Sequence, residues 1–223
     1  MKYRCIIFDC DGTLLDTLGD IAAAMNRALE IHGFATVPQE NYRDMVGWGI
    51  YRLAELALPQ DARNETNIQL LGDCATKLMG EQSEGVFTKP YPGIPELLTE
   101  LSVLKRANPK KLILAVLSNK ADSVLCQVIN RFFASVGFDA VCGLRPGIPG
   151  KPDPSMVWDF LTEAGCLPQD TIFVGDSEID IETARNAGCY PLGVSWGFRS
   201  RAVLETAGAA RIIDKPEELL AFL

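Results

Sequence analysis

Residues 8–16 read FDCDGTLLD and follow the short apolar run RCIIF at residues 4–8. An apolar run that stops at turn-forming residues is typical of a strand buried on both faces, as in a parallel sheet. Side chains two positions apart in a strand point the same way, so we expect Asp9 and Asp11 to project together at the strand's carboxyl end. Because two close carboxylates repel, this pair needs a metal ion, a shared proton or a basic partner.

The same pattern of apolar run and turn recurs along the chain. Further runs of this kind occupy residues 112–117, 171–174, 190–194 and 210–213. Helical segments separate them. One has Asp153 as its N-cap and Pro154 as its first residue and stops at Gly165, and another runs from Asp180 to about Gly188. Alternating strands and helices predict an α/β fold: a Rossmann-like parallel sheet core with helices on both faces.

One segment breaks the alternation. Residues 15–87 show helical periodicity and no convincing strand, with helices expected over about 51–58 and 66–79. A helical block between the first two strands predicts an inserted all-helical cap. The expected domains are an α/β catalytic core formed by residues 1–14 and 88–223, and a helical cap domain formed by residues 15–87. The chain of 223 residues is long enough for both.

Polar side chains stand at three further βα junctions. Ser118 and Asn119 follow the run 112–117, and Lys151 precedes a helix. Asp176 follows the run 171–174, with Asp180 shortly after it. Open parallel sheets bind ligands at the carboxyl ends of their strands, so we expect these groups to converge with the two aspartates.

The converging groups are suited to a metal ion and a phosphate. Carboxylates of Asp9, Asp11 and Asp176 would form an oxygen-rich site of the kind that Mg²⁺ prefers. Lys151 would add a fixed cation, and Ser118 with nearby backbone amides would donate to phosphate oxygens. Each residue alone has an ordinary alternative, such as a solvated loop or a helix cap. Their joint occurrence at four junctions favours a site.

These motifs resemble those of the haloacid dehalogenase-like hydrolase superfamily, and the resemblance covers the whole chain. Residues 8–16, 117–120, 150–152 and 175–180 are similar to its four motifs, in the same order. The helical insertion is similar to the cap of the phosphoglycolate phosphatase and phosphoglucomutase branch.

The resemblance implies roles at the first motif. Asp9 would be the nucleophile that forms an aspartyl-phosphate. Asp11 would protonate the leaving oxygen and then activate water, which argues against dehalogenation, where no leaving oxygen needs a proton. The Asp9 carboxylate, the Asp11 main-chain carbonyl and Asp176 would hold Mg²⁺. Gly12 and Thr13 would contribute to phosphate binding.

At the other motifs, Ser118, the Asn119 amide and Lys151 would stabilise charge on the transferring phosphoryl oxygens. Asp180 would lie behind the metal ligands and orient Lys151 or a metal-bound water.

The cap offers weaker signals about the substrate. Gly47-Trp48-Gly49 resembles the glycine-rich cap loop of phosphoglycolate phosphatases, which would close over a small substrate. The alternative is a helix–helix turn with a packing tryptophan. Residues 194–198 also resemble that branch. Arg43, Arg52 and Lys89 could each meet a substrate carboxylate, although a solvated charge is the commoner role for such residues.

Charge and cysteine content exclude several classes. The chain has 21 Lys and Arg against 29 Asp and Glu, a net charge of −8, which disfavours nucleic acid and anionic lipid as partners. No apolar stretch approaches the ~18–20 residues of a membrane helix. Seven scattered cysteines and one histidine, His32, argue against a zinc site and favour reduced thiols in the cytoplasm.

Together these observations predict a Mg²⁺-dependent phosphatase acting on a small phosphorylated metabolite, with 2-phosphoglycolate favoured. The alternatives are a phosphosugar mutase or pyrophosphatase on the same scaffold, and a phospho-acceptor signalling module. The last is disfavoured because receiver domains have no insertion after the first strand. The oligomeric state, monomer or homodimer, stays open.

Overall fold

The computed structural model describes residues 2–81, 87–107 and 112–223. A six-stranded sheet with the order β5-β4-β1-β6-β7-β8 forms its centre, and every neighbouring pair is parallel. The strands are β1 (Cys5–Phe8), β4 (Ile113–Ala121), β5 (Ala140–Leu144), β6 (Thr171–Gly175), β7 (Tyr190–Val194) and β8 (Arg211–Ile213). The predicted α/β fold class is therefore confirmed. Strand β5, at the sheet edge, was not expected from the sequence.

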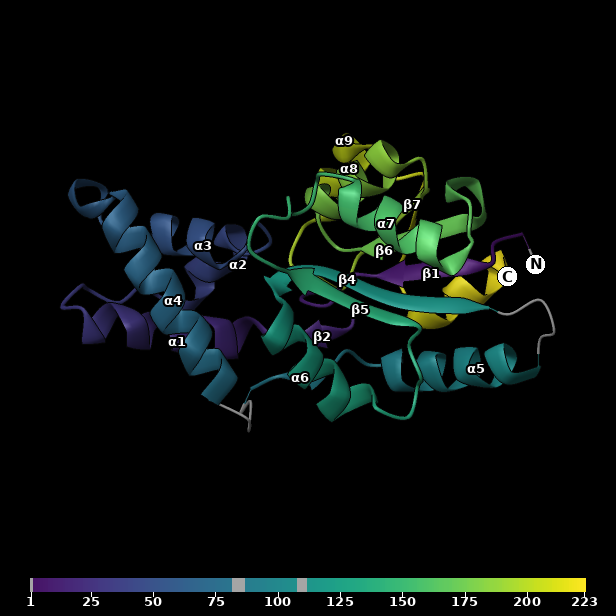
Figure 1. Cartoon of the computed structure of the whole chain (residues 1–223), viewed down its shortest axis with the longest axis horizontal. Helices are drawn as coiled ribbons and strands as arrows, with labels where there is room; N and C mark the ends of the chain where they lie inside the picture. The colour runs from purple at the N-terminus through teal and green to yellow at the C-terminus, as the bar shows by residue number, and fades with distance from the viewer. Residues whose placement is uncertain (1, 82–86, 108–111) are drawn as a thin grey trace.

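Helices cover both faces of this sheet (Figure 1). Alternate side chains of β1 enter different cores: Ile6 and Phe8 belong to one cluster, Cys5 and Ile7 to the other. The first cluster is completed by α5 (Ile94–Ala107) and α6 (Asp122–Phe133), the second by α7 (Ser155–Ala164) and α8 (Glu178–Ala187). The remaining core segments are α9 (Arg201–Ala207), η3 (Pro168–Asp170) and η4 (Pro216–Phe222).

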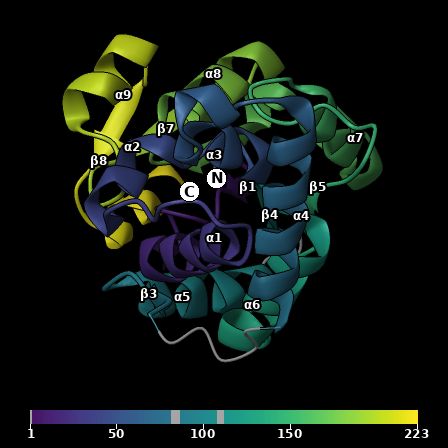
Figure 2. The ribbon, with the colours of Figure 1, turned by 90° about the vertical axis from the view of Figure 1, so that its left-hand side faces the viewer.

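A helical insertion follows the first strand of the sheet. Its segments are α1 (Leu18–Ile31), η1 (Gln39–Asn41), α2 (Tyr42–Met45), α3 (Ile50–Ala57), η2 (Gln60–Ala62) and α4 (Glu65–Glu81). Figures 1 and 2 place these helices beyond the carboxyl ends of the strands. They enclose a hydrophobic cluster of their own, which we call the insertion cluster; it includes Met25, Leu29, Tyr42 and Leu71.

The two crossings between core and insertion are paired with each other. Strands β2 (Leu15–Asp16) and β3 (Lys89–Pro90) form a short antiparallel ladder, with Leu15 opposite Pro90 and Asp16 opposite Lys89. The expected cap boundaries fall beside this ladder. Residues 82–86 of the expected cap and 1 and 108–111 of the expected core lie outside the described residues, and the domain division remains a prediction.

Two helix starts differ from those expected. Helix α7 begins at Ser155, and the Asp153 carboxylate accepts a hydrogen bond from the Ser155 N–H at 2.9 Å. Helix α8 begins at Glu178 rather than Asp180, because Ser177 and Asp180 form a capping box there. The expectation that Asp180 starts the helix was therefore wrong; it lies inside the first turn.

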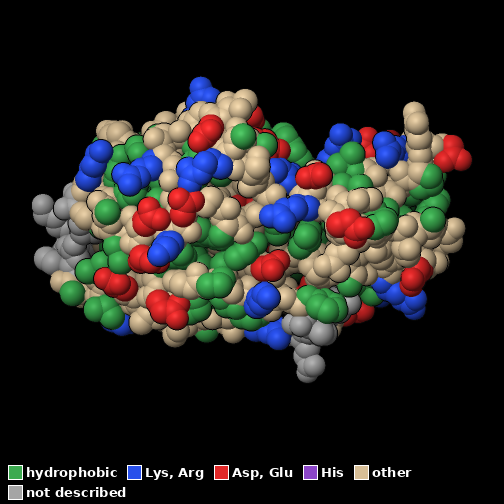
Figure 3. Space-filling view, turned by 180° about the vertical axis from the view of Figure 1, so that it is seen from behind, with side chains coloured by type: hydrophobic (Ala, Val, Ile, Leu, Met, Phe, Trp, Pro, Cys, Tyr) green, Lys and Arg blue, Asp and Glu red, His purple; other side chains and the backbone are tan. Residues whose placement is uncertain are grey.

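The surface carries both signs of charge. On the face seen in Figure 3, acidic and basic side chains are interspersed. Among the described residues, no helix is both long and apolar enough to cross a bilayer. All seven cysteines are described, and none forms a disulfide bond.

Candidate active site

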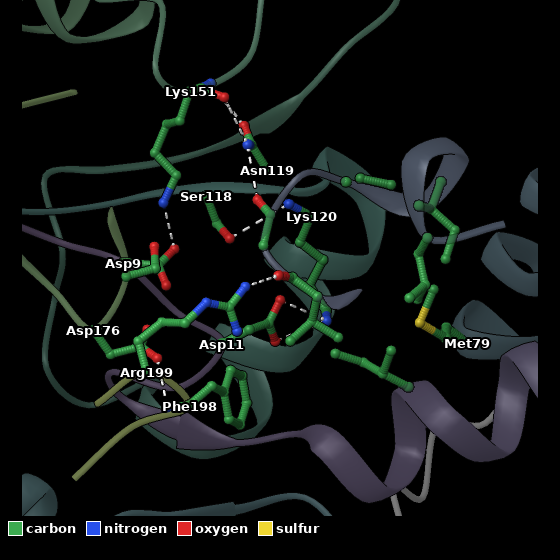
Figure 4. A pocket seen from close by; sticks show the side chains of 18 residues that line it. Asp9, Asp11, Met79, Ser118, Asn119, Lys120, Lys151, Asp176, Phe198 and Arg199 are labelled. Carbon is green, nitrogen blue, oxygen red and sulfur yellow. Dashed lines mark hydrogen bonds and ion pairs between the residues drawn. The ribbon is translucent and has the colours of Figure 1, made fainter. Parts of the chain in front are cut away.

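The two aspartates of the first motif lie in the loop that follows β1, because the strand ends at Phe8. Asp9 and Asp11 both line a cavity of about 60 Å³, shown in Figure 4. Its other walls come from the carboxyl ends of β4 and β6, from Lys151, from the loop after β7 and from the helical insertion. The groups expected to converge from four βα junctions do meet at this one place.

Lys151 lies between two carboxylates. Its ammonium Nζ is 2.7 Å from Oδ1 of Asp9 and 2.6 Å from Oδ1 of Asp180, and the residue is 5% exposed. Burial alone would lower the pKa of Lys151, but Asp180 and Asp9 together raise it above its usual range. The side chain therefore stays a cation beside Asp9.

Asp180 is fixed by the start of helix α8. Its Oδ2 accepts hydrogen bonds from the Ser177 hydroxyl at 2.6 Å and the Ser177 N–H at 3.1 Å. Its other oxygen accepts from Lys151. Since both oxygens are occupied by these partners, the geometry suits the expected role of Asp180 in orienting Lys151.

Asp176 is held in a cradle built by two glycines. Gly12 has φ +93°, and a Cβ atom there would lie 2.4 Å from Oδ2 of Asp176. A Cβ at Gly197 would lie 2.2 Å from the Asp176 Cβ. Thr13 Oγ1 donates to Oδ1 at 3.3 Å, and the Phe198 N–H donates to Oδ2 at 2.7 Å. Gly12 and Thr13, expected near the phosphate, thus contact Asp176 and are not among the described residues that line the cavity.

Asp11 faces a second lysine, to which sequence reasoning gave no role. Lys120 Nζ lies 2.9 Å and 3.1 Å from the two carboxylate oxygens of Asp11, so the contact is bidentate. Burial lowers the pKa of Lys120, but Asp11, with Cys10 and Asp9, more than offsets this effect and raises it. The available signal was its position, directly after Ser118 and Asn119 at a strand end.

Ser118 and Asn119 lie within β4, which extends to Ala121 with a register irregularity after Leu117. Ser118 lines the cavity and is 2% exposed. The Asn119 side chain accepts from the Lys151 N–H at 2.8 Å and donates to the carbonyls of Lys151 and Gly47, each at 3.0 Å. These bonds engage its side-chain amide, so an Asn119 contact to phosphate would come from the backbone N–H.

The glycine-rich loop of the insertion lies over the same cavity. Gly47 and Gly49 line it, whereas Trp48 is 44% exposed and is not among the described lining residues. Arg43, considered for a substrate carboxylate, donates to main-chain carbonyls of the core instead. Arg199 also lines the cavity, and nothing local in the sequence marked it.

The acidic groups suit a divalent cation. Ligand oxygens of Asp9, Asp176 and Asp180 all lie within 4.8 Å of one another, and all three residues are buried. With every group ionised, five carboxylates against three cations leave two negative charges: Asp9, Asp11, Asp176, Asp180 and Glu178 against Lys120, Lys151 and Arg199. An all-oxygen donor set with this charge is of the kind that binds Mg²⁺.

Carboxyl pKa values point the same way. Burial raises the pKa of Asp9 to about 7, although the Lys151 ammonium opposes the shift. Burial, with Asp180 and Asp9 nearby, also raises the pKa of Asp176 well above its usual range. The nearby cations therefore do not fully offset the burial of these two carboxyls, and a bound cation would add positive charge beside them.

This fold and this arrangement of acids and lysines define a class of hydrolase. The chain belongs to the haloacid dehalogenase-like hydrolase family, whose pattern matches residues 6–194. It is 31% identical over 195 residues to the phosphoglycolate phosphatase of Aquifex aeolicus, covering 87% of this chain and 86% of that one. It is 32% identical over 199 residues to that of Vibrio cholerae, with 88% and 86% covered.

A solved structure agrees with these sequences. The crystal structure of a candidate phosphoglycolate phosphatase from Lactobacillus delbrueckii subsp. bulgaricus has a TM-score of 0.87 and 30% identity, covering 100% of this chain and 99% of that one. The predicted family and branch are confirmed, and so is the predicted enzyme class, a phosphoric monoester hydrolase.

Proposed function

We propose that the protein is a Mg²⁺-dependent phosphatase that hydrolyses a small phosphomonoester, with 2-phosphoglycolate favoured, through an aspartyl-phosphate on Asp9. The observation that carries this proposal is the buried Lys151 ammonium held between Asp9 and Asp180, beside Asp176. A carboxylate and a fixed cation side by side support attack of Asp9 on a phosphate dianion.

Hydrolysis proceeds in two displacements at phosphorus. In the first, a carboxylate oxygen of Asp9 bonds to phosphorus while the bond to the ester oxygen breaks, and the Asp11 carboxyl gives that oxygen its proton. In the second, Asp11 takes a proton from water, the water oxygen bonds to phosphorus, and the Asp9–phosphorus bond breaks. Phosphate leaves, and both aspartates return to their starting states.

The remaining groups stabilise charge. Lys151 and Ser118 line the same cavity as Asp9 (Figure 4), and the Lys151 ammonium and Ser118 hydroxyl would donate to phosphoryl oxygens there. Mg²⁺, held by Asp9, Asp176 and the Asp11 carbonyl, would neutralise part of the phosphate charge. Asp11 accepts both hydrogen bonds from Lys120 in this structure, so its acid role requires it to turn from Lys120 toward the ester oxygen.

Two observations support a small substrate. The cavity holds about 60 Å³ and is closed on one side by Gly47 and Gly49. Curated relatives about 30% identical over most of both chains are phosphoglycolate phosphatases.

The cysteines, none of which forms a disulfide bond, also support the predicted cytoplasmic location.

The test is phosphate release from a panel of phosphomonoesters and pyrophosphate with Mg²⁺ present. We expect preferential turnover of 2-phosphoglycolate that is abolished by EDTA and by Asp9→Asn. Turnover of pyrophosphate alone would contradict the substrate. Turnover by Asp9→Asn at the wild-type rate would contradict the mechanism.

A larger substrate is the second candidate, favoured by one observation. A second cavity of about 630 Å³ shares Ile21, Met79 and Lys120 with the first and extends along α6 to Phe132. Because Asp11 protonates the leaving oxygen and contacts Lys120, the organic part of a larger ester would leave toward this second cavity. A phosphosugar, as phosphatase or mutase substrate, could use it.

A further inference from the structure

Phe198 connects the helical insertion to the proposed metal site. Its side chain is 8% exposed and belongs to the insertion cluster, although the residue lies in the core loop after β7. Its backbone N–H donates to Oδ2 of Asp176 at 2.7 Å. One residue therefore packs with the insertion through its side chain and holds an acidic group of the site through its backbone.

Two arginines fasten this loop to the insertion from both sides. Arg43 of helix α2 donates to the carbonyl of Gly197 at 2.7 Å and to that of Phe198 at 2.8 Å. In return, Arg199 donates to the Arg43 carbonyl and, at 2.8 Å, to the Val46 carbonyl. We call residues 197–199 with these four bonds the arginine clasp.

The clasp has little freedom to move independently of Asp176. A Cβ at Gly197 would lie 2.2 Å from the Asp176 Cβ and 2.5 Å from the Gly12 carbonyl oxygen, so the loop backbone is packed directly against both. Arg199 is also paired with Glu178, in the first turn of α8, at 3.1 Å. A displacement of the loop would therefore shift Asp176 or break its bond from Phe198.

We propose that the arginine clasp makes Asp176 a sensor of the insertion's position. Seating of the insertion on the core orients the carboxylate for the cation, and Arg43 acts as a positioning residue for a metal ligand that it does not touch. This inference rests on the proposed function, because that function makes Asp176 a Mg²⁺ ligand. By linkage, bound Mg²⁺ must favour the seated insertion to the same extent as seating favours Mg²⁺.

The test compares the Mg²⁺ affinity of Arg43→Met with that of the wild type, by titration calorimetry on the full chain without substrate. We expect affinity to fall about tenfold, which corresponds to about 1.4 kcal/mol. Arg27→Met is the matched control: Arg27 is an exposed arginine of the insertion that pairs with Glu30 in its own helix, so its loss should leave affinity unchanged.

A second readout follows the clasp itself. Mg²⁺ should slow amide hydrogen exchange in residues 43–47 and 196–199 of the wild type, and this protection should shrink in Arg43→Met. Phe198→Leu, which shortens the side chain in the insertion cluster and keeps the N–H, carries the same test should Arg43→Met not fold.

The outcomes separate the two proposals. If the wild type binds Mg²⁺ and hydrolyses phosphomonoesters while folded Arg43→Met or Phe198→Leu binds Mg²⁺ equally well, the clasp inference is wrong and the proposed function stands. If the wild type binds no Mg²⁺, the proposed function fails first and the clasp inference fails with it.

Discussion

Two lysines of this site each form an ion pair with a different aspartate of the first motif. Lys151 is paired with Asp9, the proposed nucleophile, and Lys120 is paired with Asp11, the proposed acid–base. Both ammonium groups are nearly buried, with side-chain exposures of 3% for Lys151 and 7% for Lys120. A buried charge that loses its partner lowers stability, so removing either lysine would leave one aspartate without its cation.

We expect Lys120→Met to lower kcat about 10- to 100-fold with a smaller change in KM, because Asp11 loses the ion pair that fixes its resting position in the cavity, from which it turns to the ester oxygen. Steady-state kinetics on the preferred substrate checks this. Lys77→Met, which removes a surface ion pair with Glu81, is the control and should change neither constant. An unchanged kcat in Lys120→Met would show that Asp11 does not depend on this lysine.

The raised carboxyl pKa values predict how stability depends on pH. Between about pH 4 and pH 7 the folded, metal-free chain holds more protons on Asp9 than the unfolded chain does. Stability from this group is therefore present at low pH and is lost as pH rises through the folded pKa. Asp176, shifted in the same direction, adds to the effect.

We thus expect the metal-free protein to melt several degrees lower at about pH 8 than at about pH 5.5, and saturating Mg²⁺ to reduce that difference, because the cation binds the deprotonated carboxylates. Thermal melts with EDTA and with Mg²⁺ give the measurement. Equal pH dependence in the two series would contradict a cation at these residues.

At the scale of structural elements, the loop after β1 has no room for a side chain at Gly12, whereas the end of α1 has room for one at Gly33. Gly12 and Gly33 have similar backbone angles, φ +93° and +77°. A Cβ at Gly12 would collide with the Asp176 carboxylate, whereas a Cβ at Gly33 would meet nothing within 4 Å. An alanine at either position would strain the backbone, but only an alanine at position 12 would also displace Asp176.

Gly12→Ala should therefore lower kcat/KM and Mg²⁺ affinity by about 100-fold or more, because Asp176 must move. Gly33→Ala should cost only about 1 kcal/mol of unfolding free energy, the price of a left-handed alanine, and keep full activity. Denaturant unfolding and kinetics on both variants decide the matter. Similar activity losses in the two would point to strain alone.

At the scale of the whole molecule, the second cavity between the insertion and α6 predicts that the protein can accept larger phosphomonoesters, which can be tested by filling the cavity. Val128 lines this cavity, and Cys126 is exposed on the same helix and is not among the described lining residues. We expect Val128→Trp to keep 2-phosphoglycolate turnover within about twofold and to reduce that of any sugar phosphate accepted about tenfold. Cys126→Trp should affect neither. Equal losses for both substrates in Val128→Trp would show that the second cavity does not discriminate by size.

The sequence predicts site residues that directly follow an apolar strand, but it does not predict contacts between residues far apart in the chain. Asp9 and Asp176 could be predicted because each stands at the end of an apolar strand. Strand β5 could not, since AVCGL is a short, partly exposed edge segment without clear periodicity. Phe198 contacts residues more than 100 positions away, and no local pattern records such a contact. The start of α8 could have been read from the Ser177…Asp180 capping box.

The ladder between β2 and β3 allows the helical insertion to be replaced without rebuilding the parallel sheet. The chain leaves the core at Asp16 and returns at Lys89, and these two residues are direct partners. Adjacent exit and return points let a foreign segment of any length be grafted between them without altering the register of the parallel sheet. We therefore expect a chimera that keeps both the ladder and the Arg43 contacts to the Gly197 and Phe198 carbonyls to retain phosphate cleavage, while its new insertion changes the wall of the cavity.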